Sequence, residues 1–146
     1  MANLIKIAVD CMGGDDDARF VIPGLDKTLR NNNDLSFLLF GDKSIIEKRL
    51  SNYKHLANSS EIFHTEHHIK MDDKPSQAIK KGKRVSGMWK AIESVRDNHA
   101  DFVISAGNTG ALMAMATLIL KTISKIQRPA IAALWPTVDG ETIVLI

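Results

Sequence analysis

The chain has 146 residues, enough for one ordinary domain with a buried core, and its apolar content of 45% with 25% charged residues is that of a soluble globular protein. A formal charge of +2 is too small to indicate nucleic-acid binding, and the single cysteine, Cys11, excludes an internal disulfide and indicates a reducing compartment. The N-terminus has no signal-peptide pattern, and the longest near-apolar stretch, residues 111–120, is too short to span a bilayer.

The first half of the chain alternates strand and helix signals. Residues 4–9 form a short apolar run followed by turn residues, which predicts a buried strand. Residues 20–29 predict a helix that either starts near Pro23 or is kinked there. Further along we expect a strand over 37–40, a helix over 44–50 capped by Ser44 with Glu47 in a capping box, and a strand over 61–64.

The second half continues the alternation. Ser86 is expected to cap a helix whose apolar residues share one face. A strand over 102–104 leads into the loop 105–110 and then an apolar helix, and two more strands are expected over 130–134 and 142–146. Strands separated by helices predict βαβ units and an α/β fold with a mostly parallel sheet, in a single domain over 1–146. Because the chain stops inside an apolar strand, we expect this domain to be the N-terminal part of a longer protein.

Ligands of open α/β sheets bind outside the carboxyl ends of the strands, and two loops qualify. In the loop 105–110, Gly107 and Gly110 permit close backbone approach to a ligand. The helix that begins near Gly110 offers unpaired N–H groups and its positive dipole end. Ser105, Asn108 and Thr109 add side-chain donors. The loop therefore predicts an anion site, and the alternative is a turn whose glycines only satisfy geometry.

The other loop, residues 10–17, has the glycine pair Gly13 and Gly14 but four surrounding acidic residues: Asp10, Asp15, Asp16 and Asp17. A phosphate within a few ångströms of these carboxylates would be repelled, at a cost on the order of 1 kcal/mol near a surface. This loop is therefore a poor phosphate site unaided. Asp10 or Asp15 could instead order the loop or act as a base. The alternative is that these carboxylates only form Asx turns and helix caps.

Three other features suggest chemistry less specifically. Lys80, Lys81, Lys83 and Arg84 form a basic run, which is either a solvated face or a docking patch for an acidic partner. The histidines and acids of residues 64–73 do not have the spacing of a closed metal site, so we expect a solvated loop and no metal. Cys11 follows a strand with no histidine nearby in sequence, which favours an inert buried thiol over a nucleophile.

Several segments together resemble one family, the phosphate acyltransferases (the PlsX family of acyl-acyl carrier protein:phosphate acyltransferases). The matching segments, in chain order, are Ile7 to Asp15, Met71 to Ala78, Ser105 to Leu112, and Arg128 to Ala130 with Pro136, Thr137 and Gly140. The resemblance covers nearly all of the chain. It departs from the family at Cys11, where alanine is usual, at 16–18, and in length, since members of the family are well over twice as long.

The resemblance implies a three-layer α/β fold akin to isocitrate and isopropylmalate dehydrogenases, here truncated, and usually a homodimer. It implies transfer of a fatty acyl group from acyl carrier protein to inorganic phosphate, giving acyl phosphate for phospholipid synthesis, whose later steps include a glycerol-3-phosphate acyltransferase. No cofactor and no nucleic acid are implied. The family is cytoplasmic, with some members peripherally attached to the membrane.

We therefore expect the loop 105–110 to hold phosphate, with Asn108 and Thr109 as the principal side chains. Asp10 and Asp15 are expected to order the first loop, and the basic run around Lys81 to meet the carrier protein. Phosphate is itself a nucleophile, so the task is positioning and oxyanion stabilisation. The alternatives are a phosphate acetyltransferase-like enzyme that uses an acyl-CoA, and a non-catalytic truncated fragment.

Overall fold

The computed structural model describes residues 4–14 and 18–146, and its centre is a four-stranded parallel sheet in the order β3-β2-β1-β4. The strands are β1 (Ile5–Asp10), β2 (Leu35–Gly41), β3 (Ser60–His64) and β4 (Phe102–Ser105). All three pairings are parallel, as the βαβ pattern predicted. The first four predicted strands and the α/β fold class are confirmed.

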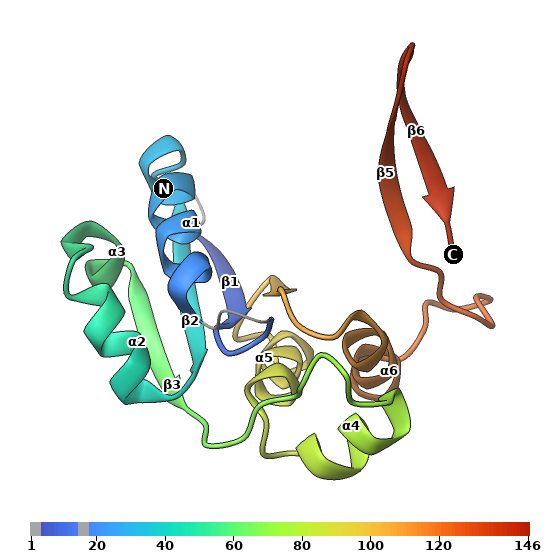
Figure 1. Ribbon diagram of the computed structural model, residues 1–146, viewed down its shortest axis with the longest axis horizontal. Helices are drawn as coiled ribbons and strands as arrows, with labels where there is room; N and C mark the ends of the chain where they lie inside the picture. The colour runs from blue at the N-terminus through green and yellow to red at the C-terminus, as the bar shows by residue number, and fades with distance from the viewer. Residues whose placement is uncertain (1–3, 15–17) are drawn as a thin grey trace.

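Helices cover both faces of this sheet, which makes three layers (Figure 1). They are α1 (Ala18–Asn31), α2 (Lys43–Leu50), α3 (Lys54–Asn58), α4 (Pro75–Gly82), α5 (Gly87–Arg96) and α6 (Thr109–Leu120). Side chains alternate between the two faces of each strand. On β1, Val9 packs in the core beneath α1, whereas Ala8 packs against α5 on the other face. A sheet buried on both faces explains why β1 and β2 read as nearly continuous apolar runs.

Two helix starts differ from the sequence prediction. Helix α1 begins at Ala18 and continues through Pro23, so of the two alternatives that the sequence left open, a start near Pro23 is wrong. Helix α2 is capped by Asp42, whose carboxylate accepts hydrogen bonds from the backbone N–H of Ser44 at 2.8 Å and of Ile45 at 3.2 Å. The predicted Ser44 cap is therefore wrong. An aspartate one residue before the helix accepts from its first turn better than a serine already inside it.

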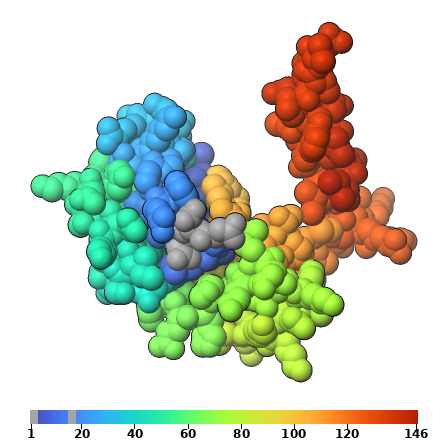
Figure 2. All heavy atoms as spheres, viewed as in Figure 1, coloured from blue at the N-terminus to red at the C-terminus, as the bar shows by residue number. Residues whose placement is uncertain are grey.

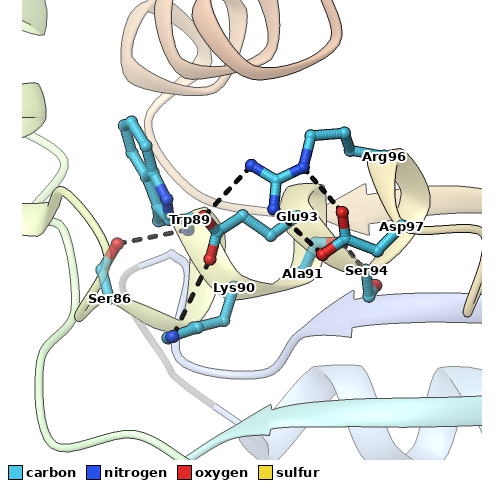
Figure 3. Close-up of polar contacts among 8 residues, drawn as sticks. All are labelled: Ser86, Trp89, Lys90, Ala91, Glu93, Ser94, Arg96 and Asp97. Atoms are coloured by element: carbon cyan, nitrogen blue, oxygen red, sulfur yellow. Dashed lines mark hydrogen bonds and ion pairs between the residues drawn. The ribbon is translucent and has the colours of Figure 1, made fainter.

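The helix predicted after Ser86 is confirmed as α5. The Ser86 hydroxyl accepts a hydrogen bond from the Trp89 backbone N–H at 3.2 Å (Figure 3). At the other end, the Arg96 guanidinium donates to both carboxylate oxygens of Asp97, at 2.7 and 2.9 Å. The buried face of α5 packs on the sheet and on α6, and the two helices form a second apolar cluster with α4. This packing places the start of α6 beside the ends of β1 and β4.

The last two strands form a separate antiparallel hairpin, β5 (Ala132–Thr137) and β6 (Gly140–Leu145). Strands were predicted in both places, but they do not extend the parallel sheet. Only two residues connect them, and a parallel pair requires a crossover of a dozen or more residues. The hairpin stands away from the three layers (Figures 1 and 2). Among the described residues, no helix has the length and apolar character needed to cross a membrane.

Candidate functional site

The carboxyl ends of β1 and β4 lie side by side, with Asp10 paired in register with Ser105. The Ser105 hydroxyl donates a hydrogen bond to Asp10 Oδ2 at 2.8 Å, and the Gly107 N–H donates to Ser105 Oγ at 3.0 Å. These bonds connect the loop after β1 to the loop after β4. The two loops singled out from the sequence therefore meet at one edge of the sheet.

Asp10 is buried, with 3% of its surface exposed. Burial raises the pKa of its carboxyl, while hydrogen bonds from Ser105 and the Met12 backbone, and the nearby His68, act in the opposite direction. A carboxyl that accepts from both loops at the base of the site is suited to fixing their positions. The ordering role of Asp10 stays a prediction that agrees with its hydrogen bond from Ser105, whereas Asp15, with Asp16 and Asp17, lies outside the described residues.

Glycine is required where the two loops touch. A Cβ on Gly13 would lie 2.7 Å from the Gly107 backbone nitrogen and 2.9 Å from Asp10 Oδ2. Gly14 has a φ of +96°, and a Cβ there would lie 3.2 Å from the Ala106 carbonyl oxygen. The glycines thus allow backbone to approach backbone. This close contact requires glycine at position 13, and the predicted role of Gly13, Gly14 and Gly107 in binding phosphate stays a prediction.

Asn108 has a different position from the one expected. Its side-chain Oδ1 accepts from the Ala111 N–H at 2.9 Å, which makes Asn108 the N-cap of α6. Its Nδ2 lies within hydrogen-bonding distance of the carbonyl oxygens of Lys70, Met71 and Asp73, at 3.2, 2.9 and 2.8 Å. The side chain is buried and its donors and acceptor face protein groups. A catalytic role for Asn108 stays a prediction, and this geometry favours a positioning role.

The first two residues of α6 retain the anion-binding potential predicted for this loop. Among the described residues, the backbone N–H groups of Thr109 and Gly110 have no hydrogen-bond partner, whereas that of Ala111 donates to Asn108. Thr109 is exposed and Gly110 is half-buried. Free N–H groups at the positive end of a 12-residue helix are the arrangement that binds phosphate in many proteins. Gly110 also lies close to Pro75, since a Cβ there would be 3.0 Å from the Pro75 ring.

The basic run lies near this site. Lys80 and Lys81 are in the last turn of α4, and Lys83 and Arg84 follow it, all four exposed. Lys81 Nζ lies 2.6 Å from Asp73 Oδ1, and this ion pair lowers the pKa of Asp73. Asp73 is also one of the residues whose carbonyl oxygen faces Asn108. Asp73, in the loop 70–73, therefore contacts both Asn108 through its carbonyl oxygen and Lys81 through its carboxylate.

Sequence reasoning missed two residues beside Asp10. Gly87 begins α5, and a Cβ on it would lie 3.0 Å from Asp10 Oδ1 and 3.2 Å from Thr65 Oγ1. Thr65 is 8% exposed, and its hydroxyl has no hydrogen-bond partner in the described part of the chain. Nothing in the local pattern around Thr65 indicates this position, because the residues that surround it come from distant strands. The glycine directly after the Ser86 cap was the available signal for Gly87.

Other candidate residues take no part in the described site. Cys11 is fully buried, and burial followed by the neighbouring Asp10 raises the pKa of its thiol, which keeps it protonated and unreactive. This supports the inert reading of Cys11. His64 accepts a hydrogen bond from the Lys43 N–H at 3.2 Å. Within residues 4–14 and 18–146, no group of three His, Cys, Asp or Glu side chains is placed to hold a metal ion.

A family model and several curated relatives match this chain, and they point to the same family. A family model described as "Fatty acid synthesis protein" matches residues 5–146. The curated relatives include a phosphate acyltransferase of Rhodopseudomonas palustris, 50% identical over 145 residues, which are 99% of this chain and 41% of the relative. One of Agrobacterium fabrum is 50% identical over 142 residues, 97% of this chain and 40% of the relative.

The phosphate acyltransferase of Beijerinckia indica is 48% identical over 145 residues, 99% of this chain and 38% of the relative. The chain thus spans about two fifths of the length of the curated relatives it matches. The family match extends over the sheet, the site and the hairpin, and it agrees with the resemblance seen in the sequence motifs. The chain therefore belongs to the fatty acid synthesis protein family, the family of the phosphate acyltransferases.

Proposed function

We propose that this chain is part of an enzyme that transfers a fatty acyl group from acyl carrier protein to inorganic phosphate. The relatives' name, phosphate acyltransferase, supports this reaction class. The structural observation that carries it is the start of α6, where the Thr109 and Gly110 N–H groups are unpaired beside the Gly13–Gly107 contact. An anion held there lies against the joined ends of β1 and β4, where ligands of α/β sheets bind.

The proposed reaction needs no covalent enzyme intermediate. An oxygen of hydrogen phosphate attacks the thioester carbonyl carbon and forms the new C–O bond. The carbonyl oxygen carries the negative charge in the tetrahedral intermediate, and the C–S bond then breaks. The sulfur leaves with the proton that hydrogen phosphate carried, which gives acyl phosphate and the free carrier thiol. The enzyme's contribution is to hold the two reactants together and to stabilise the oxyanion.

Each site residue has a part in this proposal. Thr109 and Gly110 hold phosphate through their N–H groups, and the Thr109 hydroxyl is a further donor. Ser105 and Asp10 fix the Gly107 end of the loop through the bonds at 2.8 and 3.0 Å. Asn108 acts as a positioning residue that joins α6 to the loop 70–73. Asp15 is proposed to order the loop after β1.

The basic run is proposed as the docking patch for the carrier protein. Lys80, Lys83 and Arg84 are exposed, while Lys81 is paired with Asp73 on the loop that Asn108 holds. Opposite charges at such a patch mainly raise the rate of encounter. A cytoplasmic homodimer, peripheral attachment at the inner face of the membrane, and delivery of acyl phosphate to a glycerol-3-phosphate acyltransferase complete the proposal for the whole protein.

A second candidate follows from the coverage of the relatives. Because the chain spans 41% of the Rhodopseudomonas relative, a non-catalytic fragment of such an enzyme is the alternative. A phosphate acetyltransferase-like enzyme that uses an acyl-CoA is the alternative within enzymes. The two enzyme reactions share the phosphate site and differ only in the thioester donor.

The test joins residues 1–146 to the remaining part of the Rhodopseudomonas relative and measures thiol release from an acyl carrier protein thioester and from acetyl-CoA. We expect phosphate-dependent release from the carrier thioester by the joined protein, and none by residues 1–146 alone if they are a fragment. Preferential release from acetyl-CoA would favour the acyl-CoA alternative. Release at the same rate with and without phosphate, by a folded protein, would contradict the proposal.

A further inference from the structure

A buried hydroxyl group lies at the base of the candidate site. Thr65 directly follows β3, and its N–H donates to the Gly41 carbonyl oxygen at 2.8 Å, which holds the backbone in place. The residue is 8% exposed, and its Oγ1 is closed to solvent and makes no hydrogen bond to a described residue. Leaving a buried hydroxyl unpaired is costly, so such groups almost always have a partner. Because the described residues already enclose this oxygen, its partner is expected among them.

Gly87, the first residue of α5, shows which groups are nearest to this hydroxyl. A Cβ on Gly87 would lie 3.0 Å from Asp10 Oδ1, 3.2 Å from Thr65 Oγ1 and 3.3 Å from the carbonyl oxygen of residue 40. The three oxygens therefore border one small space beside the Gly87 backbone. The Phe40 carbonyl oxygen already accepts from the Cys11 N–H at 2.9 Å. A carboxylate is also the stronger acceptor, which favours Asp10 Oδ1 as the partner of the Thr65 hydroxyl.

We propose that Thr65 is a positioning residue for Asp10: its hydroxyl turns toward Oδ1 and donates a hydrogen bond to the carboxylate. Ser105 already donates to the other oxygen, Oδ2, at 2.8 Å. The carboxylate is then held from two sides, by the residue after β3 and by the end of β4. The inference rests on the proposed function, in which Asp10 and Ser105 fix the loop that leads to the phosphate site of α6. Thr65 acts on that site through Asp10 and does not touch phosphate.

The surroundings of Asp10 allow this hydrogen bond to be measured. The positive end of the α5 dipole lies beside the carboxylate and favours its charged form, as does the exposed His68. Burial raises the pKa of the neighbouring Cys11 thiol, which keeps it protonated. A substitution at Thr65 leaves the helix, the histidine and the thiol in the chain. A change in the titration of Asp10 in such a variant therefore reports on the Thr65 hydroxyl.

The test follows the Asp10 side-chain carboxyl by carbon NMR as the pH of the 146-residue chain is changed. In Thr65→Val, which has nearly the same shape but no hydroxyl, the pKa of Asp10 should rise by about one pH unit, because the carboxylate loses a donor. Thr65→Ser keeps a hydroxyl and should restore the wild-type titration. Thr117→Val is the matched control, since it removes a hydroxyl that donates to the Met113 carbonyl oxygen within α6, and it should leave the Asp10 titration unchanged.

Circular dichroism and thermal unfolding establish that each variant folds. Should Thr65→Val fail to fold, Thr65→Ala is compared with Thr65→Ser in the same way. An Asp10 titration that is unchanged in the folded variant without the hydroxyl would overturn the inference, and this is the result expected if the Phe40 carbonyl oxygen is the partner. A Thr65→Ser protein that titrates like Thr65→Val would also overturn it, because shape and not the hydroxyl would then be responsible.

The same samples separate this inference from the proposed function. Titration with inorganic phosphate, followed at the amides of Thr109 and Gly110, should show several-fold weaker binding in Thr65→Val than in the wild type. If phosphate shifts these amides but the Asp10 titration is the same in both proteins, the Thr65 inference fails and the phosphate site stands. If the pKa of Asp10 rises in Thr65→Val but phosphate shifts neither amide in the wild type, Thr65 positions Asp10 and the proposed phosphate site fails.

Discussion

The parallel sheet and the β5–β6 hairpin contain similar apolar residues in very different surroundings. In the sheet, Val9 and Leu39 are 1% and 0% exposed, because helices cover both faces. In the hairpin, Leu134 and Ile143 are 69% and 66% exposed. Since hydrophobic stabilisation scales with the area removed from water, the sheet accounts for most of it and the hairpin for little. Strand propensity alone therefore does not determine where the core forms.

The candidate site lies entirely in the first of these two regions. Every residue of the candidate site belongs to the sheet, its loops or the helices packed on it. The hairpin contributes no residue to the described contacts of Asp10, Ser105 or Asn108. Mutations in the two regions should therefore differ in their effects on stability, and mutations in the site loops should affect both stability and phosphate binding.

The largest contrast is expected between Ile22→Ala in α1 and Leu134→Ala in the hairpin. Ile22 is fully buried in the cluster between α1 and the sheet, so its truncation should lower the free energy of unfolding by about 2–5 kcal/mol. Leu134→Ala should change it by less than about 0.5 kcal/mol. Urea denaturation of both variants checks this prediction. Equal losses would show that the hairpin packs on the core in solution.

A second contrast uses two glycines. Gly13→Ala should destabilise by about 1–3 kcal/mol, because its Cβ would meet the Gly107 backbone at 2.7 Å. Gly24→Ala should stabilise by about 0.5–1 kcal/mol, since its Cβ meets nothing and alanine favours a helix. Thermal unfolding of the two variants gives the comparison. The account of the loop contact would be wrong if Gly13→Ala matched the wild type.

Asn108→Ala tests the clamp between α6 and the loop 70–73. Loss of the cap and of the bonds to the carbonyl oxygens of Met71 and Asp73 should lower stability by about 1–3 kcal/mol. Amide hydrogen exchange in residues 70–73 should accelerate at the same time. Thr109→Ala is the control, because Thr109 is exposed and its side chain makes no described hydrogen bond. Unchanged exchange in 70–73 would argue against a positioning role.

The smallest expected effect is a change in pH dependence in Asp10→Asn. Because burial raises the pKa of Asp10 in the folded protein, the folded state binds this proton more tightly than the unfolded state. The stability that Asp10 contributes is thus complete below the unfolded pKa, about 3.9, and is lost as pH rises through the raised folded pKa. Relative to wild type, Asp10→Asn should gain stability across that window. Parallel urea curves for the two proteins at every pH would contradict this.

Local patterns were sufficient for some parts of this structure. The apolar runs predicted β1 to β4, and Ser86 predicted the start of α5, because both signals depend on neighbours in sequence. The Asp42 cap and the direction of the hairpin were not predicted, and for α1 the sequence left open whether the helix starts near Pro23 or passes through it. The cap depends on which of two nearby polar residues, Asp42 or Ser44, lies just before the helix, and the direction of the hairpin depends on which strands pair in the folded chain.

The sequence predicted where the candidate site lies in the fold, but not which residues contact one another there. The loops at 10–17 and 105–110 do meet, since the ends of β1 and β4 are neighbours in the sheet. The partners of Asn108 could not be predicted, because they lie 35 to 38 residues away. The same reason explains why Thr65 and Gly87 were missed: their proximity to Asp10 exists only after β1, β3 and α5 have packed together.

The most direct test of the account is a titration of the isotopically labelled chain with inorganic phosphate, followed by amide resonances. The account predicts saturable shifts centred on Thr109 and Gly110, with chloride at matched ionic strength having little effect. The N–H of Ala111, which already donates to Asn108, should move less. Shifts spread over exposed lysines, or none at the start of α6 in the folded chain, would contradict the proposed phosphate site.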